Sequence, residues 1–394
     1  MTVSPAESTE SAVPHHDPTV ESTVPHRDPA VSLTAFDGSR LRVVLMLDIR
    51  DGTQQEFLEA YERMRDRVAS VPGHISDQLC QSLENPTQWL ITSEWESALP
   101  FLSWVNSEEH LETVKPMEDC VRDTRSMRYS VMRETFSRRT PAAGDGPQPA
   151  PRVGGNVVRH AITFTVRPGS EPEVARILSD YASPEARVDA TTRLLRTSLF
   201  LHGNRVVRAV EVHGDLQAAL RHVARQPEVR AVEEAINPYL EQDRDLTNPQ
   251  SARLFFTRAA LPAVHHVTAG QDAAGVQRLA LFYPARPGSG QALARLLAGQ
   301  DQAAAGVPGS PLVACTVFHR DDLVVRLVDT TADPELAPGP VLALPTPEAL
   351  AEAGRLLDTA ALGLDGPPAG DRDLPRLLAR ARMRPLTDRR APAS

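Results

Sequence analysis

The chain has 394 residues, 41% of them hydrophobic and 24% charged, and its formal net charge at pH 7 is -9. These values predict roughly two or three folded domains, and an acidic chain without a basic stripe is a poor candidate for nucleic-acid binding. The cysteines lack metal-ligand spacing, residues 1–30 contain no signal-peptide core and no apolar run reaches the length of a membrane span, so we expect a cytoplasmic protein.

Residues rich in Ser, Thr, Pro and Glu begin the chain at 1–38, a composition typical of a disordered tail. A breaker-rich stretch at 138–155 predicts a linker, and residues 388–394 predict a second tail. The sequence between these stretches divides into segments at 39–137, 156–262 and 275–387.

The first segment alternates strand and helix patterns. A strand over 40–49 precedes a helix over 52–71, in which Phe57, Tyr61, Met64 and Val68 share one face. Further strands are predicted over 74–84 and 88–97, then a helical stretch from Ala98 and a closing strand over 126–136. The order β-α-β-β-α-β predicts a ferredoxin-like α+β unit.

The tryptophans of the chain fall within this segment, at Trp89, Trp95 and Trp104. Strand alternation places Trp89 and Trp95 on one face of their strand, and Trp104 belongs to the helix that follows. Two interpretations stay open for the strand pair: they line a barrel cavity, or they pack under the helices as core.

The second segment has the same order of elements. A strand over 157–166 leads into a helix over 171–181, and a hairpin turns at His202-Gly203-Asn204. Asp215 is a predicted helix N-cap. The closing strand is predicted at "ARLFFTR", residues 252–258, with His265 and His266 in a loop after it.

The third segment repeats the second at an offset of about 118 residues, which indicates a duplicated domain. Phe164 corresponds to Phe282, Arg208 to Arg326 and Glu211 to Asp329. The closing strand of this copy is predicted at "RARMRPLTD", residues 380–388.

A ferredoxin-like sheet has helices on one face and needs a partner for the other. Three such units therefore predict dimeric-type α+β barrels with a central cavity. The second and third segments can form one barrel within the chain, and the first can pair with its copy in a second chain as a homodimer. A different pairing inside the chain stays open.

The first segment resembles the antibiotic biosynthesis monooxygenase family of dimeric α+β barrels. The resemblance lies in "VPGHISDQL" (71–79), "WLITSEWES" (89–97) and "FLSWVNSEEH" (101–110). "PGH" here replaces the family's "PGF".

The second segment resembles the SchA/CurD-like proteins of aromatic polyketide and spore-pigment gene clusters. The matching stretches are "RHAITFTVRPGSE" (159–171), "GNRVVRAVEVHGDL" (203–216), "RAVEEAINPYLEQDRDL" (230–246) and "ARLFF" (252–256). Together the two resemblances imply a tailoring monooxygenase that hydroxylates a polycyclic aromatic polyketide with dioxygen. Alternatives are a polyketide cyclase or aromatase, or a scaffold that holds intermediates for a partner oxygenase or another tailoring enzyme.

Sequence signatures for flavin, nicotinamide or a metal triad are absent, because no GxGxxG follows a strand and no ligand spacing is readable. We therefore expect no cofactor, and the substrate must supply the electrons. Electron-rich polyphenols suit this chemistry, because the phenolate formed by deprotonation can reduce dioxygen by one electron. The protein then needs a base, a water-excluding pocket and donors for the anion.

Three residues of the first segment are candidate catalytic groups. His110 is the candidate base, because the ordinary pKa of histidine, about 6.5, suits proton transfer; an exposed helix-end histidine is the alternative. Trp95 is a candidate cavity wall or indole N–H donor. Asn106 is a candidate donor to an oxyanion or, equally, a helix cap.

Candidate substrate-binding residues come from all segments. Arg208 stands among aliphatic residues, so it is expected to be buried and to hold either a carboxylate or a bound phenolate. The full set is Trp89, Tyr129, Arg133, Arg208, Tyr239 and Arg326.

Overall fold

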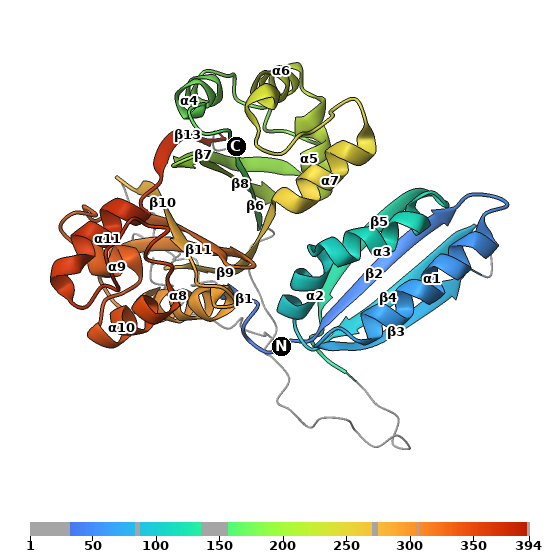
Figure 1. Cartoon of the computed structure of the whole chain (residues 1–394), viewed down its shortest axis with the longest axis horizontal. Helices are drawn as coiled ribbons and strands as arrows, with labels where there is room; N and C mark the ends of the chain where they lie inside the picture. The colour runs from blue at the N-terminus through green and yellow to red at the C-terminus, as the bar shows by residue number, and fades with distance from the viewer. Residues whose placement is uncertain (1–31, 83–86, 135–156, 270–274, 306, 392–394) are drawn as a thin grey trace, which may run out of the picture.

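The computed structural model describes residues 32–82, 87–134, 157–269, 275–305 and 307–391. Each of the three segments forms an α+β unit of the predicted ferredoxin-like kind, hereafter units one, two and three (Figure 1). The predicted linker at 138–155 lies outside the described residues. Among the described residues, no helix is both long and apolar enough to span a membrane.

Unit one is a four-stranded antiparallel sheet in the order β3-β4-β2-β5, with its helices on one face (Figure 1). The apolar stripe of the first helix packs on the sheet as predicted, with Phe57, Tyr61, Met64 and Val68 all buried. The closing strand begins earlier than predicted. The elements are β2 (Leu41–Ile49), α1 (Gln54–Ala69), β3 (His74–Gln81), β4 (Gln88–Trp95), α2 (Ala98–Val105), α3 (Glu108–Glu118) and β5 (Val121–Ser130).

The two strand tryptophans of unit one face its helices. Trp95 is 1% exposed and its ring meets Phe101 of α2 edge-on, with centroids 5.6 Å apart. Trp89 meets Phe57 of α1 in the same way at 5.5 Å. Both therefore belong to the core, which is the second of the two interpretations that the sequence left open.

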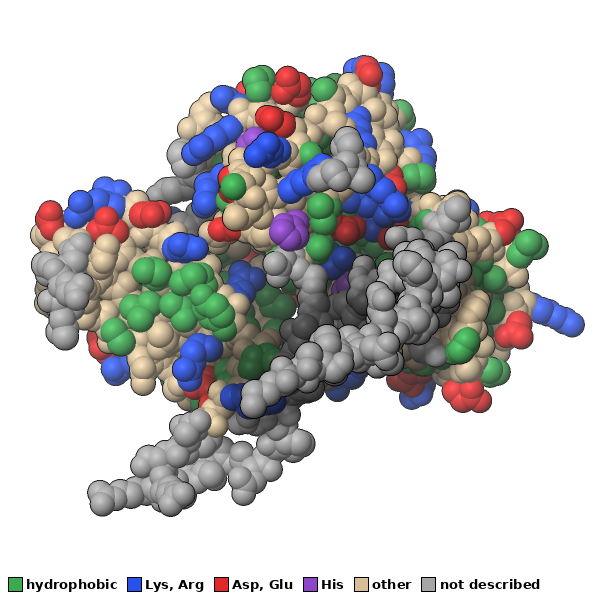
Figure 2. All heavy atoms as spheres, turned by 180° about the vertical axis from the view of Figure 1, so that it is seen from behind, with side chains coloured by type: hydrophobic (Ala, Val, Ile, Leu, Met, Phe, Trp, Pro, Cys, Tyr) green, Lys and Arg blue, Asp and Glu red, His purple; other side chains and the backbone are tan. Residues whose placement is uncertain are grey.

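The opposite face of this sheet carries an apolar patch, hereafter the open face (Figure 2). Residues that alternate with the buried set point to it, and Met46 and Tyr129 are 47% and 50% exposed there. The open face consists of Val44, Met46, Leu90, Met127 and Tyr129. Figure 2 shows these hydrophobic side chains as one surface flanked by charges.

Unit two follows the predicted order with one correction near its end. The stretch "ARLFFTR" is helical, with Phe255 turned inward onto Phe164 and Phe256 37% exposed. The closing strand is the next one, which contains the buried His265 and His266 that were expected in a loop. This strand crosses the predicted domain boundary at residue 262.

Asp215 caps its helix as predicted and accepts hydrogen bonds from the backbone N–H groups of Gln217 and Ala218. The elements of unit two are β6 (Val157–Thr165), α4 (Glu171–Ser179), β7 (Arg193–His202), β8 (Arg205–His213), α5 (Leu216–Arg225), α6 (Pro227–Ile236), η1 (Asn237–Tyr239), α7 (Pro249–Ala259) and β9 (Ala260–Thr268).

Unit three repeats this plan, but its closing strand begins four residues later than predicted, because Arg380 and Ala381 still belong to the preceding helix. That strand continues to Arg390, beyond the predicted start of the C-terminal tail at residue 388. The elements of unit three are β10 (Gln277–Pro284), α8 (Gly290–Ala305), β11 (Leu312–Arg320), β12 (Leu323–Thr330), α9 (Pro338–Leu342), α10 (Pro347–Leu356), η2 (Asp371–Asp373), α11 (Leu374–Ala381) and β13 (Arg384–Arg390).

Units two and three together form a closed barrel, one of the arrangements that the sequence left open. Their strands run in the order β10-β12-β11-β9-β6-β8-β7-β13. The ends of this order meet, because Leu281 and Arg382 form a bridge and the Met383 N–H donates to Ala280 O at 2.9 Å. Each closing strand thus lies between its own unit and the other, β9 beside β11 and β13 beside β7.

The lumen of this barrel is filled by side chains rather than forming the predicted central cavity. Its middle layer is apolar and belongs to the largest hydrophobic cluster of the described residues; it includes Ala161, Phe200, Val207, Leu261, Ala280, Phe282, Phe318 and Leu327. One end holds a balanced set of charges, hereafter the lumen charge layer, formed by Arg159, Arg196, Glu211, Arg278, Asp329 and Asp388.

The short strand β1 (Ser32–Thr34) pairs with β9 at the residues of β9 that β6 leaves unpaired. This part of residues 1–38 is therefore ordered, and the prediction of a disordered tail is wrong for it; residues 1–31 lie outside the described range.

Unit one contacts the barrel through α2, whose Leu99 joins the barrel's hydrophobic cluster.

Candidate functional site

The candidate site lies between the sheet of unit one and its helices, where His74 and Asp77 are buried together. His74 opens β3 directly after Gly73, which has a φ of +83° and a backbone so close to α2 that an added Cβ would lie 2.6 Å from Pro100 Cγ. The register sets His74 opposite Trp95 and Asp77 opposite Ser93. Both side chains therefore point toward the helices.

The two side chains lie against each other under the helices, within ion-pair distance. His74 Nε2 lies 3.5 Å from Asp77 Oδ1, and each side chain is 7% exposed. The Trp95 ring stands edge-on to the His74 ring, with centroids 5.1 Å apart, and the Trp95 indole N–H donates to Ser93 Oγ at 3.0 Å. The indole thus has a fixed position against one face of the pair.

Burial sets the protonation of the groups around the pair. It raises the pKa of Asp77, although the adjacent His74 opposes this shift. Burial and the negative charge of Asp77 raise the pKa of Tyr61 to about 12, so that Tyr61 stays a phenol at neutral pH. An imidazole beside a carboxylate, with a neutral phenol near it, is an arrangement suited to moving one proton.

Comparison with known proteins identifies the family to which this chain belongs. The antibiotic biosynthesis monooxygenase family matches residues 40–116, and the SchA/CurD like domain family matches residues 157–269. Protein SchA from Streptomyces halstedii is 74% identical over 92% of this chain and 96% of its own length. The chain belongs to the SchA/CurD-like family.

Other SchA/CurD-like relatives match over nearly their whole length. A 42.8 kDa protein in the whiE locus of Streptomyces coelicolor is 66% identical over 100% of both chains. Polyketide synthase CurD from Streptomyces cyaneus is 62% identical over 91% of this chain and 97% of its own.

Solved structures resemble a single unit of this SchA/CurD-like chain. SnoaB, a cofactor-independent oxygenase from Streptomyces nogalater, is 14% identical and covers 25% of this chain and 97% of its own, with a TM-score of 0.23. A putative antibiotic biosynthesis monooxygenase from Nitrosomonas europaea is 15% identical and covers 26% and 98%, with a TM-score of 0.24.

Two of the residues predicted to be catalytic lie at the α2–α3 junction of this SchA/CurD-like protein, and Trp95 lies at the end of β4. Asn106 is the C-cap of α2, and its Nδ2 donates to Leu102 O at 2.7 Å, so the helix-cap interpretation is confirmed. His110 lies in the first turn of α3 with its ring 5.3 Å from that of Trp104. Trp95 contacts His74, as described above.

Two predicted substrate contacts of unit one lie far from the His74–Asp77 pair. Tyr129 is on the open face and its hydroxyl donates to Met127 Sδ at 3.2 Å. Arg133 lies within the closing strand predicted over 126–136, but β5 ends at Ser130, so Arg133 follows the strand and is exposed.

The two duplicated arginines form structural ion pairs on the helix-facing side of the barrel. Arg326 is 0% exposed and donates to Asp301 of α8 at 2.6 Å. Arg208 pairs with Glu233 of α6, which also accepts from Arg244 at 2.7 Å. The interpretation as an ion pair therefore holds for both. Tyr239, in η1, is partly buried against the core of unit two.

Sequence reasoning missed His74 and Asp77 as functional groups. The available signal was the departure from the family pattern, because "PGH" places His74 where the family has phenylalanine. Tyr61 was assigned only to the core face of its helix, and the position of Asp77 opposite Ser93 requires knowledge of the register.

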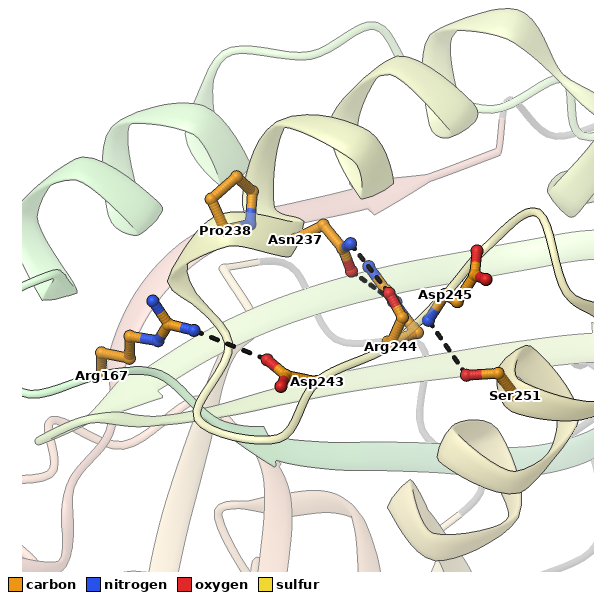
Figure 3. A pocket seen from close by; sticks show the side chains of 7 residues that line it. All are labelled: Arg167, Asn237, Pro238, Asp243, Arg244, Asp245 and Ser251. Atoms are coloured by element: carbon orange, nitrogen blue, oxygen red, sulfur yellow. Dashed lines mark hydrogen bonds and ion pairs between the residues drawn. The ribbon is translucent and has the colours of Figure 1, made fainter.

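A surface pocket of unit two is lined by Arg167, Asn237, Pro238, Asp243, Arg244, Asp245 and Ser251 (Figure 3). Its polar groups bind one another: Arg244 Nε donates to Asn237 Oδ1 at 3.0 Å, and Arg167 lies 3.5 Å from Asp243. These contacts fix the loop after η1. Among the described residues, no group of three or more His, Cys, Asp or Glu side chains is arranged to hold a metal ion.

Proposed function

We propose that this SchA/CurD-like protein is a monooxygenase that hydroxylates a polycyclic aromatic polyketide in type II polyketide antibiotic or spore-pigment biosynthesis. The observation that carries the proposal is the buried His74–Asp77 pair in a unit that matches the antibiotic biosynthesis monooxygenase family. The name of the relative CurD, a polyketide synthase, supports the substrate class.

The proposed reaction begins when His74 removes the proton of a substrate phenol, and the Asp77 carboxylate stabilises the resulting imidazolium. The phenolate gives one electron to dioxygen, and the phenoxyl radical and superoxide combine at a ring carbon. The peroxide takes the proton back from His74, and the resulting hydroperoxide loses water together with the remaining hydrogen of that ring carbon. One oxygen atom becomes a quinone carbonyl and the other leaves as water, so the substrate supplies all the electrons and no flavin or metal is required.

The other predicted catalytic residues act as positioning residues in this scheme. Trp95 holds the His74 ring edge-on, and its own N–H is fixed by Ser93. Asn106 ends α2, and His110 packs on Trp104 of that helix. Both thus position the helix that covers the His74–Asp77 pair. Trp89 lies opposite Gln81, at the other end of β3, and packs on Phe57 as part of the core.

Labelled dioxygen tests the proposal. The purified protein is incubated with a reduced polyhydroxylated anthrone under isotopically labelled dioxygen, and the product is analysed by mass spectrometry. We expect one labelled oxygen atom per quinone formed and no product without oxygen. Equal turnover under anaerobic conditions would exclude a monooxygenase.

The same acid–base pair favours a second candidate, a polyketide cyclase or aromatase, because aldol closure and dehydration need only proton transfer. This enzyme would form a ring without incorporating label. A third candidate, a scaffold for a partner oxygenase, would bind the anthrone without converting it.

The open face supports a homodimer. Units two and three cover each other's sheets within the chain, whereas unit one has the same topology and leaves its apolar face exposed. A second copy would cover it and complete a barrel of the dimeric type.

A further inference from the structure

The barrel end opposite the lumen charge layer carries two arginines beside an aromatic ring, and we call this group the barrel mouth. Arg205 opens β8 and Arg320 ends β11, while His202 ends β7 and Phe282 lies near the end of β10. Their strands bring these four residues to the same end of the barrel. They come from both units, so the mouth exists only because the barrel is closed.

The two arginines of the barrel mouth have little counter-charge. No carboxylate among the described residues forms an ion pair with Arg205, whose Nη1 donates to Thr163 Oγ1 at 3.3 Å. Arg320 donates to Ala260 O at 2.9 Å, and its ion partner Asp321, at 3.6 Å, has a side chain that is 74% exposed. At the other end of the barrel, by contrast, Arg278 bonds both Asp329 and Glu211 at 2.6 Å.

Partial burial makes these unneutralised charges costly. Burial lowers the pKa of Arg205, the positive charge of Arg320 lowers it further, and the exposed Glu241 opposes the shift only in part. Burial also lowers the pKa of Arg320, whose side chain is 15% exposed. An anion bound between the two guanidinium groups would relieve this cost.

The aromatic ring adds a second kind of contact. The Arg205 guanidinium lies over the Phe282 ring at 5.7 Å from its centroid, and the His202 ring is 5.0 Å from the same ring. Together the guanidinium, imidazole and phenyl groups, with the two rings tilted at 50° to each other, favour a flat ligand over a compact ion.

The duplication indicates that the fold does not demand these arginines. The residue of unit three that corresponds to Arg205 is Leu323, and the residue of unit two that corresponds to Arg320 is His202. The same barrel position therefore accepts an aliphatic side chain in one half and a cation in the other. We propose that the barrel mouth is a binding site for a planar aromatic carboxylate or phenolate, with Arg205 and Arg320 holding the anionic oxygens.

Calorimetric titration of the full chain tests this site with 1,8-dihydroxyanthraquinone-3-carboxylate as the probe. We expect the probe to bind the wild-type protein, and Arg205→Gln and Arg320→Gln each to weaken binding by roughly tenfold or more, because each removes a charge-assisted contact. Arg176→Gln, at an exposed arginine of α4, is the matched control and should bind as the wild type does. Circular dichroism and thermal melting verify that each variant folds.

Two comparison ligands identify what is recognised. The same quinone without its carboxylate should bind at least roughly tenfold more weakly, and inorganic phosphate should displace the probe only at much higher concentration. Equal affinity of both quinones, or unchanged affinity in both mouth variants, would overturn the proposal. The inference does not depend on the oxygenase function, because His74→Ala should leave probe binding at the mouth unchanged.

Discussion

His74 and His110 each lie edge-on to a tryptophan of unit one, at 5.1 Å from Trp95 and 5.3 Å from Trp104. His74 also lies 3.5 Å from the buried Asp77. A general base needs a neighbouring group that orients it, and Asp77 lies within reach of His74, so His74 is the stronger candidate for the base.

Replacing the two histidines separates their roles. We expect His74→Ala to lower turnover by roughly a hundredfold or more, the size of a general-base contribution, and His110→Ala to lower it far less. Steady-state oxygen consumption with the anthrone substrate measures both. A larger loss of turnover in His110→Ala than in His74→Ala would identify His110 as the base.

The pH dependence of stability tests the state of Asp77. Its folded-state pKa is raised above the unfolded value, so its contribution to stability is present below the unfolded pKa and is lost as pH rises through the folded one. Urea unfolding of the wild type and Asp77→Asn between about pH 4 and pH 7 should show the wild type losing stability relative to the variant as pH rises. A difference that is independent of pH would contradict the raised pKa.

Residue patterns predicted the stripe of α1 and the shared face of Trp89 and Trp95, because both follow from helix and strand periods. Periodicity does not determine which face of the strand meets the helices. That orientation decides whether Trp89 and Trp95 belong to the core or line a cavity. The role of Asn106 as a cap likewise needed the end of α2 to be known.

At the scale of elements, the corresponding arginines of units two and three have kept their position but changed their partner. Arg208 pairs with Glu233 on the second helical region of unit two, whereas Arg326 pairs with Asp301 on the first helix of unit three. The strand position is thus repeated while the covering helices have diverged.

Removing Arg326 should be strongly destabilising. Arg326→Met would leave Asp301 buried without a counter-charge, which costs roughly 3–5 kcal/mol of unfolding free energy. Urea unfolding, monitored by far-UV circular dichroism, measures this loss of unfolding free energy. Arg376→Met, at an exposed ion pair with Asp365, is the control and should have little effect. An equal loss in both variants would contradict a special role for the buried pair.

Element positions were predictable where strand patterns were clean, as in the hairpin that turns at Gly203. The prediction failed at "ARLFFTR", where adjacent aromatic residues resemble a strand. There Arg244 packs against the rings of both Phe255 and Phe256, at 4.7 and 5.6 Å from their centroids, so a helix can support two neighbouring aromatic residues. Contacts from a distant loop are not visible in a local pattern.

At the scale of the whole molecule, the repeat in the sequence made a barrel of units two and three one possible pairing, but it predicted a central cavity where the lumen is full. Lumen packing depends on which residues of eight strands meet at one level, for example Phe200, Phe282 and Phe318. That information lies in the register and not in any single strand.

Disrupting the open face should dissociate the proposed dimer. We expect static light scattering to give the molar mass of a dimer for the wild type and of a monomer for Met46→Glu. The substitution would place a charge in the apolar interface. Leu220→Glu, at a residue of α5 that is 40% exposed, is the matched control and should keep the wild-type mass. A wild-type monomer at all concentrations would exclude the dimer.

The closed barrel of units two and three is a covalently joined pair, in which the chain itself supplies the partner. Its closure is therefore unimolecular and persists at any dilution, whereas a barrel built from unit one of two chains obeys mass action. The barrel mouth would then bind its ligand with the same affinity at every protein concentration. A reaction that depends on the paired form of unit one would instead lose specific activity on dilution. The protein concentration would then set the specific activity without changing the affinity of the barrel mouth for its ligand.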